Sequence, residues 1–262
     1  MSDQGRQPRT ERNEEYDAAL KALHGHPAYQ EMLAIDEVQR SLHWVFNPNW
    51  RELMALLDEA GDNISLAIEL VQNVRPSNVQ RTFTAEVTRR LHNHFASTAS
   101  LVDHVRRLLR GRAGRVIDEI NSKIRELASR PELKVVDDLR NYTLHRTLPL
   151  LGHQLSAVRR GDNGTFALSS KVQMDVQELL AWDRWSPESR RFLEEQGKAV
   201  DLRALIQTQG QLVLDLNVWI VDRLTAENEQ GLQEADELRV AANAALAGVD
   251  IETARKFGDG NP

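Results

Sequence analysis

The sequence contains no cysteine among its 262 residues, so it forms no disulfide bond, no zinc site built on thiolates and no thiol nucleophile. It also has no run of ~18 consecutive apolar residues, which a membrane-spanning helix would require. The N-terminal segment MSDQGRQPRTERNEEYD is polar and charged without an apolar core, so we expect it to be neither a signal peptide nor an anchor. These absences predict a cytoplasmic protein that does not associate with a membrane.

The sequence likewise has no excess of basic residues. Lys and Arg number 33 against 39 Asp and Glu, a net charge of −6, which argues against a protein that coats nucleic acid through its overall charge. A local basic patch is compatible with this balance. Hydrophobic residues make up 41% and charged residues 27%, which is ordinary for a globular protein with a substantial core.

Apolar residues recur at helical spacing along most of the chain, which predicts an all-α protein. Residues 1–12 are expected to form a disordered tail. Residues 13–75 are expected to form an N-terminal helical extension, interrupted by the NPN motif at 47–49. The main helical domain then covers residues 76–225, and residues 226–262 form a C-terminal helix with a frayed tail.

The main domain is expected to contain one small β-hairpin among its helices. Residues spaced by three and four predict a helix of about nine turns over 79–109. The seam that it is expected to bury consists of Phe83, Val87, Leu91, Phe95, Thr98, Val102, Val105 and Leu109. A shorter helix over 116–127 follows, and another spans 131–148 between two prolines. Alternating apolar residues around the turn signal GDNG predict the hairpin, HQLSAVRRGDNGTFALSS. Two further helices begin at the capping residues Ser186 and Asp201.

A polar stripe lies on the long helix about 200° away from its apolar seam. Its members step by four and three and are mostly small or uncharged: Asn93, Ser97, Ser100, His104 and Arg107. A helix face that only contacts solvent usually carries Glu and Lys. The stripe is therefore either a solvated face of unusual composition or a face that binds a substrate.

A second polar cluster lies in the segment DDLRNYTLHRTLP, near the end of the helix predicted over 131–148. The apolar side of that helix consists of Val135, Leu139 and Tyr142. Another side carries Asp138, Asn141 and His145, and the long side chain of Arg140 reaches the rim of this group. Such a cluster either fixes helix packing through buried hydrogen bonds or serves chemistry at an accessible surface.

The segment LRNYTLH resembles the motif of the HEPN superfamily, which is an Arg, a polar residue, three further residues and a His. HEPN stands for higher eukaryotes and prokaryotes nucleotide-binding, and its domains are all-α. The segment RLHNHFASTASLVDHVRRL resembles the preceding helix in a bacterial branch of that superfamily. The resemblance covers about residues 76–225, and it implies a HEPN-like antiparallel helical bundle.

The resemblance further implies a metal-independent endoribonuclease without a cofactor, in which two copies of the motif face a shared cleft of a homodimer. Carried over by position, the catalytic residues are Arg140, Asn141 and His145. Histidine exchanges protons near neutral pH, and a guanidinium suits the extra negative charge on a phosphate under attack. Asn141 orients the imidazole or holds a phosphate oxygen. One histidine cannot easily be both acid and base, but a dimer supplies two.

The residues expected to bind the substrate are Asn93, Ser97, His104, Arg107 and Arg146. The acidic pair Asp137 and Asp138 would repel phosphate unless it pairs with arginine. The arginines within 106–115 offer a basic patch that compensates for it. Expected partners are RNA, a second copy of the chain, and an antitoxin or other regulatory protein, in a toxin or phage-defence setting.

Two other functions stay open at this point: a non-catalytic helical protein-interaction module, and a module that binds nucleotides without cleaving them. The string HNH at 92–94 does not indicate a metal-dependent nuclease. His92 and His94 lie about 200° apart on one helix and cannot bind the same ion.

Overall fold

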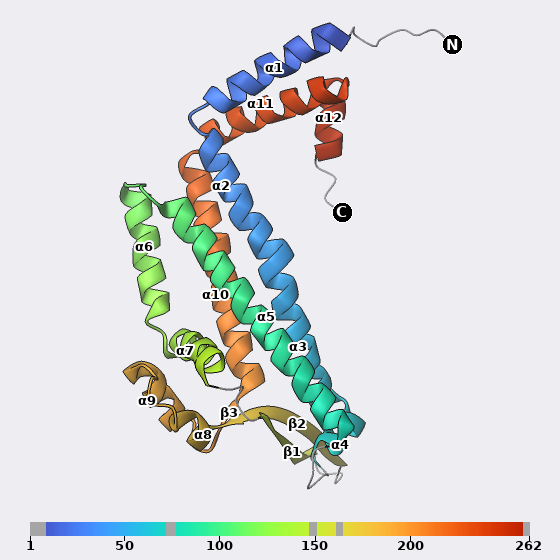
Figure 1. The fold of residues 1–262 in the computed structure, drawn as a ribbon, viewed down its shortest axis with the longest axis vertical. Coiled ribbons are helices and arrows are strands. Elements are labelled where there is room, and N and C mark those ends of the chain that lie inside the picture. The colour runs from blue at the N-terminus through green and yellow to red at the C-terminus, as the bar shows by residue number, and fades with distance from the viewer. Residues whose placement is uncertain (1–8, 72–76, 147–150, 161–164, 259–262) are drawn as a thin grey trace, which may run out of the picture. The chain divides into compact units, whose positions relative to one another are not determined.

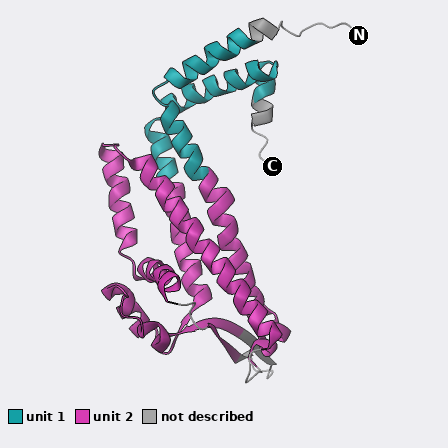
Figure 2. Cartoon of the chain, viewed as in Figure 1, with its two compact units in different colours: residues 1–39, 220–262 teal, residues 40–219 magenta. Residues whose placement is uncertain are grey.

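The computed structural model describes residues 9–71, 77–146, 151–160 and 165–258. The chain divides into two compact units (Figure 2), a larger one of residues 40–219 and a smaller one of residues 1–39 and 220–262. The boundary expected between residues 75 and 76 lies inside the larger unit, because the chain on both sides of it contributes to one core.

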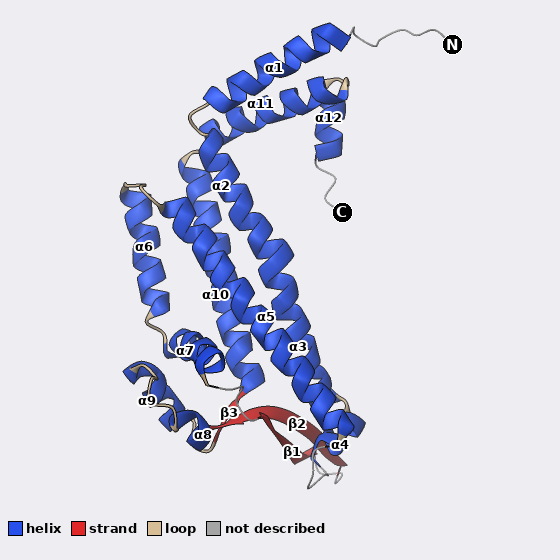
Figure 3. Ribbon diagram, in the orientation of Figure 1, coloured by secondary structure: helices blue, strands red, loops and turns tan. Residues whose placement is uncertain are grey.

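Helices make up most of the larger unit (Figures 1 and 3), as expected from the periodicity of the sequence. In chain order its elements are η1 (Ser41–Phe46), α3 (Asn47–Asp62), α4 (Ile64–Val71), α5 (Asn78–Leu109), α6 (Arg115–Ala128), α7 (Pro131–His145), β1 (Leu151–Arg160), β2 (Thr165–Asp175), α8 (Val176–Leu180), α9 (Pro187–Glu195), β3 (Ala199–Asp201) and most of α10 (Leu202–Glu227). The long helix expected over 79–109 is confirmed as α5. Ser77 and Gln80 form a capping box at its start.

The three strands form one antiparallel sheet in the order β1-β2-β3. The predicted hairpin is confirmed as β1 and β2, and its expected GDNG turn at 161–164 lies outside the described residues. The third strand was not expected. It has only three residues, too few to show an alternating pattern, and it pairs with β2 across the register Gln173↔Asp201. A strand this short is defined by its partner.

The break expected at the NPN motif is wrong, because the chain stays helical from Tyr29 through Asp62. Pro48 has no backbone N–H and cannot donate to the carbonyl four residues earlier, at Trp44. The residues just before it widen into the π-helix η1, in which the N–H of Asn47 donates to the carbonyl of Leu42, five residues back. The wider turn absorbs the proline without ending the helix.

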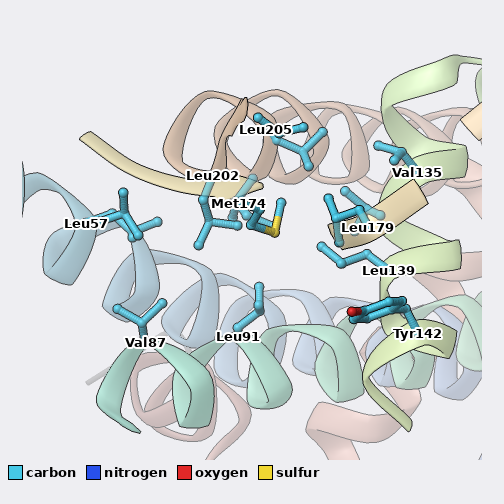
Figure 4. Packing of buried hydrophobic residues seen from close by; sticks show 14 of the residues in the cluster. Leu57, Val87, Leu91, Val135, Leu139, Tyr142, Met174, Leu179, Leu202 and Leu205 are labelled. Carbon is cyan, nitrogen blue, oxygen red and sulfur yellow. The ribbon is translucent and has the colours of Figure 1, made fainter. Parts of the chain in front are cut away.

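The core of the larger unit lies between α3, α5, α7, α10 and the sheet (Figure 4). In α5 the expected seam is confirmed from Phe83 to Phe95. Beyond Phe95 the buried positions are Ser97, Leu101, Val105 and Leu108, and Val102, which was expected to be buried, is exposed. Beyond Phe95 the buried positions therefore lie one residue earlier than expected, except at Val105.

A polar pair is buried between α5 and α10. His94 has no exposed surface, and its Nε2 lies 2.7 Å from Oε1 of Gln209. Because an amide oxygen only accepts, Nε2 carries the hydrogen, and Nδ1 has no partner among the described residues. Phe46 at the end of η1 covers the imidazole, with ring centroids 5.7 Å apart. Burial lowers the pKa of His94 to about 4, against a smaller opposing effect of the Gln209 hydrogen bond.

Next to this pair, α3 and α10 approach so closely that a side chain at position 210 has no room. A Cβ atom built on Gly210 would overlap the indole ring of Trp50. We therefore expect Gly210→Ala to lower the free energy of unfolding by about 1–3 kcal/mol through overpacking, although alanine is ~1 kcal/mol better than glycine within a helix. Urea unfolding measures this difference.

The matched control for this prediction is Gly25→Ala. A Cβ on Gly25 meets nothing within 4 Å, and that change should leave stability within about 0.5 kcal/mol of the wild type. An alanine at position 210 that is neutral or stabilising would contradict the close approach of the two helices.

The smaller unit consists of helices: α1 (Arg9–Gly25), α2 (Tyr29–Arg40), the end of α10, α11 (Glu229–Ala247) and α12 (Ile251–Gly258). Its core cluster consists of Leu23, Ala28, Met32 and Ala235. Two polar contacts fasten it: His26 Nε2 lies 3.3 Å from the Glu234 carboxylate, and Asn228 donates to Glu31 at 2.8 Å. Residues 9–12 and 251–258, expected in the disordered and frayed tails, are helical.

None of the described helices is long and apolar enough to cross a membrane.

Candidate functional site

The helix α7 carries the residues of the expected catalytic motif, and its position is set by its apolar side. Val135, Leu139 and Tyr142 are buried in the core, as the sequence predicted. Tyr142 packs against both Trp182 and Trp185, at centroid distances of 5.5 and 5.8 Å, and these two rings also contact each other. Figure 4 shows the Tyr142 ring beside Leu139, facing the core. This anchoring turns the opposite side of α7 away from the core.

The motif residues lie on that outer side, along the last one and a half turns of α7. Arg140 and Asn141 are partly exposed, and His145, the last residue of the helix, is exposed. Asn141 and His145 are four residues apart and therefore neighbours on the helix surface. Over the described residues, the side chains of these three form no hydrogen bond or ion pair within the fold. They are free to contact a ligand.

Arg146 follows directly and is also exposed. Its guanidinium carbon lies 5.8 Å from the centroid of the Tyr142 ring, a cation–π distance. Burial, followed by the negative charge of Glu178, raises the pKa of Tyr142, and the Arg146 guanidinium opposes this. Tyr142 therefore stays protonated at neutral pH and acts as a platform for Arg146. The sequence placed Arg146 at the site but did not indicate that contact.

Asp138 does not join the motif residues, although the spacing of the sequence aligned it with Asn141 and His145. Its carboxylate accepts from the backbone N–H of Ser186 at 2.9 Å and from the Ser186 hydroxyl at 2.6 Å. Ser186 is the N-cap of α9, so Asp138 stabilises the start of a helix 48 residues further along the chain. The carboxylate is therefore held by hydrogen-bond donors of Ser186.

This contact gives Asp138 a structural role that can be measured. We expect Asp138→Ala to lower the free energy of unfolding by about 1–3 kcal/mol, because the Ser186 donors lose a charged acceptor. Asp137→Ala is the control, since Asp137 is exposed and should change stability by less than about 0.5 kcal/mol. Equal effects of the two substitutions in a denaturant titration would contradict the assignment.

The polar stripe on α5 does not form one continuous surface. Ser97 is buried and donates its hydroxyl to the backbone carbonyl of His94 at 2.9 Å, so it is not available to a ligand at the surface. Asn93 and His104 are partly exposed, and Arg107 is exposed. Arg107 Nη2 lies 2.7 Å from His104 Nδ1, which joins these two residues to each other near the end of the helix.

Sequence reasoning missed two contributors to this region. The rings of Trp182 and Trp185 pack against Tyr142 and thereby hold α7 in place. Trp185 also donates its indole N–H to the carbonyl of Leu179 at 2.6 Å. The segment AWDRWSP hinted at them, because two tryptophans three residues apart before a helix cap are unusual. Nothing in the pattern indicated which helix they would hold.

Within the described part of the chain, no three His, Asp or Glu side chains are arranged to hold a metal ion. Comparison of the chain with models of protein families, with curated proteins and with solved structures found no match.

Proposed function

We propose that the protein is a cytoplasmic, metal-independent endoribonuclease of the HEPN type, and that it cleaves RNA with Arg140, Asn141 and His145. The observation that carries the proposal is the exposure of this motif on a helix that is otherwise held in the core. Polar residues retained for packing would be buried and bonded to the fold. These residues are accessible and make no such bond among the described residues.

The chemistry follows from the three side chains and from the structure of RNA. A neutral imidazole removes the proton of a ribose 2′-hydroxyl, which attacks the adjacent phosphorus. The bond to the 5′-oxygen of the next nucleotide breaks, and a protonated imidazole donates a proton to that leaving oxygen. The Arg140 guanidinium stabilises the negative charge that builds up on the phosphate oxygens. The products carry a 2′,3′-cyclic phosphate and a 5′-hydroxyl.

The mechanism needs two histidines in different protonation states, and α7 supplies one. A homodimer in which two His145 residues face each other provides both. We expect the purified protein to have twice the monomer mass of 29.7 kDa in light scattering. A toxin or phage-defence role with a restraining partner protein follows from the resemblance alone.

The test is cleavage of end-labelled single-stranded RNA in the presence of EDTA. The wild type should produce fragments that end in a cyclic phosphate, and it should leave DNA of the same sequence intact because DNA has no 2′-hydroxyl. A double variant, Arg140→Ala with His145→Ala, should be inactive. If the wild type leaves RNA intact, or if the double variant cleaves as fast as the wild type, the proposal fails and the motif surface is a binding surface.

A further inference from the structure

Charge is unevenly divided between the two compact units. The smaller unit contains 8 Lys and Arg against 17 Asp and Glu, a net charge of −9. The larger unit contains 25 against 22, a net charge of +3. The overall charge of −6 therefore conceals a basic unit, and this unit holds the candidate site. A polyanion would be attracted to the larger unit and repelled by the smaller one.

The basic charge concentrates at the turn that joins α5 to α6. Residues 104–117 contain no Asp or Glu and five arginines, which we call the arginine turn: Arg106, Arg107, Arg110, Arg112 and Arg115. Gly111 and Gly114 have φ angles of 72° and 131°, which residues other than glycine rarely adopt. The two glycines bend the chain so that the arginines at the end of α5 and at the start of α6 share one loop.

Local structure accounts for some of these arginines and not for others. Arg106 pairs with Asp103 at 3.1 Å, and Arg107 contacts His104. Positive charge near the end of α5 is favourable. Arg115, in contrast, is the first residue of α6, where positive charge opposes the helix dipole and is unfavourable. Arg110 and Arg115 are exposed and form no ion pair with another described residue. Their charges are therefore available to a partner.

We propose that the arginine turn binds the phosphate backbone of an RNA strand and holds it for the candidate site, an inference that rests on the proposed function. Forked guanidiniums on a turn without acidic residues suit phosphates, and such contacts do not read the base sequence. The turn and the start of α7 lie at opposite ends of α6 (Figure 1), whose fourteen residues span ~21 Å, and the motif begins nine residues further along α7. A strand of about six stacked nucleotides, at ~3.4 Å each, covers the length of α6, so an RNA of 20 nucleotides is long enough to extend from the turn past the start of α7.

The test measures binding separately from cleavage. The ligand is a fluorescent 20-nucleotide RNA with 2′-O-methyl groups, which cannot be cleaved through its 2′-oxygen. Binding of the wild type and of the variant Arg110→Gln/Arg115→Gln is measured between about 50 and 200 mM salt. The variant should bind roughly tenfold more weakly, and its plot of log affinity against log salt should be flatter by about 1.4, or ~0.7 for each lost phosphate contact.

The control variant Arg51→Gln/Arg81→Gln also removes two positive charges, but from parts of α3 and α5 that lie away from the turn. It should retain the wild-type salt dependence. Equal slopes for the wild type and the turn variant, equal losses in both variants, or wild-type binding of anionic vesicles but not of the RNA would overturn the inference. Because this RNA cannot be cut, binding is measured independently of cleavage. A protein that binds it through the turn but cleaves no RNA would refute the proposed function and leave the binding inference intact.

Discussion

His145→Ala is expected to lower the rate of RNA cleavage by about 10²–10⁴-fold, the usual contribution of a general acid or base. The alanine removes the group that exchanges protons with the 2′-hydroxyl and the leaving 5′-oxygen. Arg140→Ala is expected to lower the rate by about 10²–10³-fold, because the charge on the phosphate loses a preorganised donor. Single-turnover cleavage of labelled RNA in EDTA measures both effects at the chemical step.

The same two substitutions are expected to leave the melting temperature nearly unchanged, because Arg140 and His145 form no bond within the described fold. This separates a catalytic role from a structural one. His92→Ala is the matched control: His92 is exposed on α5, and its loss should affect neither cleavage nor stability. Loss of stability in the His145 variant, or an equal loss of cleavage in the His92 variant, would contradict the assignment of His145 as the proton-transfer group.

The second large effect concerns stability and pH, and it arises from His94. Its pKa is lowered to about 4 in the folded protein, mainly by burial, whereas a histidine in an unfolded chain titrates near ~6.5. Between these values the unfolded state binds more protons, so stability falls as pH falls. The loss contributed by His94 should be about 2 kcal/mol at pH 5 and about 3 kcal/mol below pH 4. Above pH 6.5 this contribution to stability is complete.

Between pH 6.5 and 5 the change in stability comes mainly from histidine protonation, because carboxyl groups titrate mostly below pH 5. Burial also lowers the pKa of His153, which acts in the same direction. His94→Gln should flatten the profile by about 2 kcal/mol, since glutamine is uncharged and can still bond to Gln209. His92→Gln on the exposed side of α5 should keep the wild-type slope. Urea unfolding at several pH values measures this, and identical slopes for the two variants would refute the role of His94.

Local chemistry determined a large part of this fold from the sequence alone. The capping residues Ser77 and Gln80 and the three-and-four spacing after them define α5, and Pro131 at the first turn defines the start of α7. The alternating residues around GDNG define the hairpin of β1 and β2. The pattern also placed Leu139 and Tyr142 on the core side of α7, but it left open whether the motif residues are buried or accessible. Each of these features depends on residues that lie close together in the chain.

Only the tertiary structure decided which partners the polar residues have. Asp138 bonds to Ser186, and His94 to Gln209, across separations of 48 and 115 residues. A helical pattern states that such a side chain lies on a given face, but it does not state what that face meets. The pairing of β3 has the same origin, because it depends on β2, a neighbour from another part of the chain. Packing energies between distant segments override local preference where the local signal is weak, as it is for a strand of three residues.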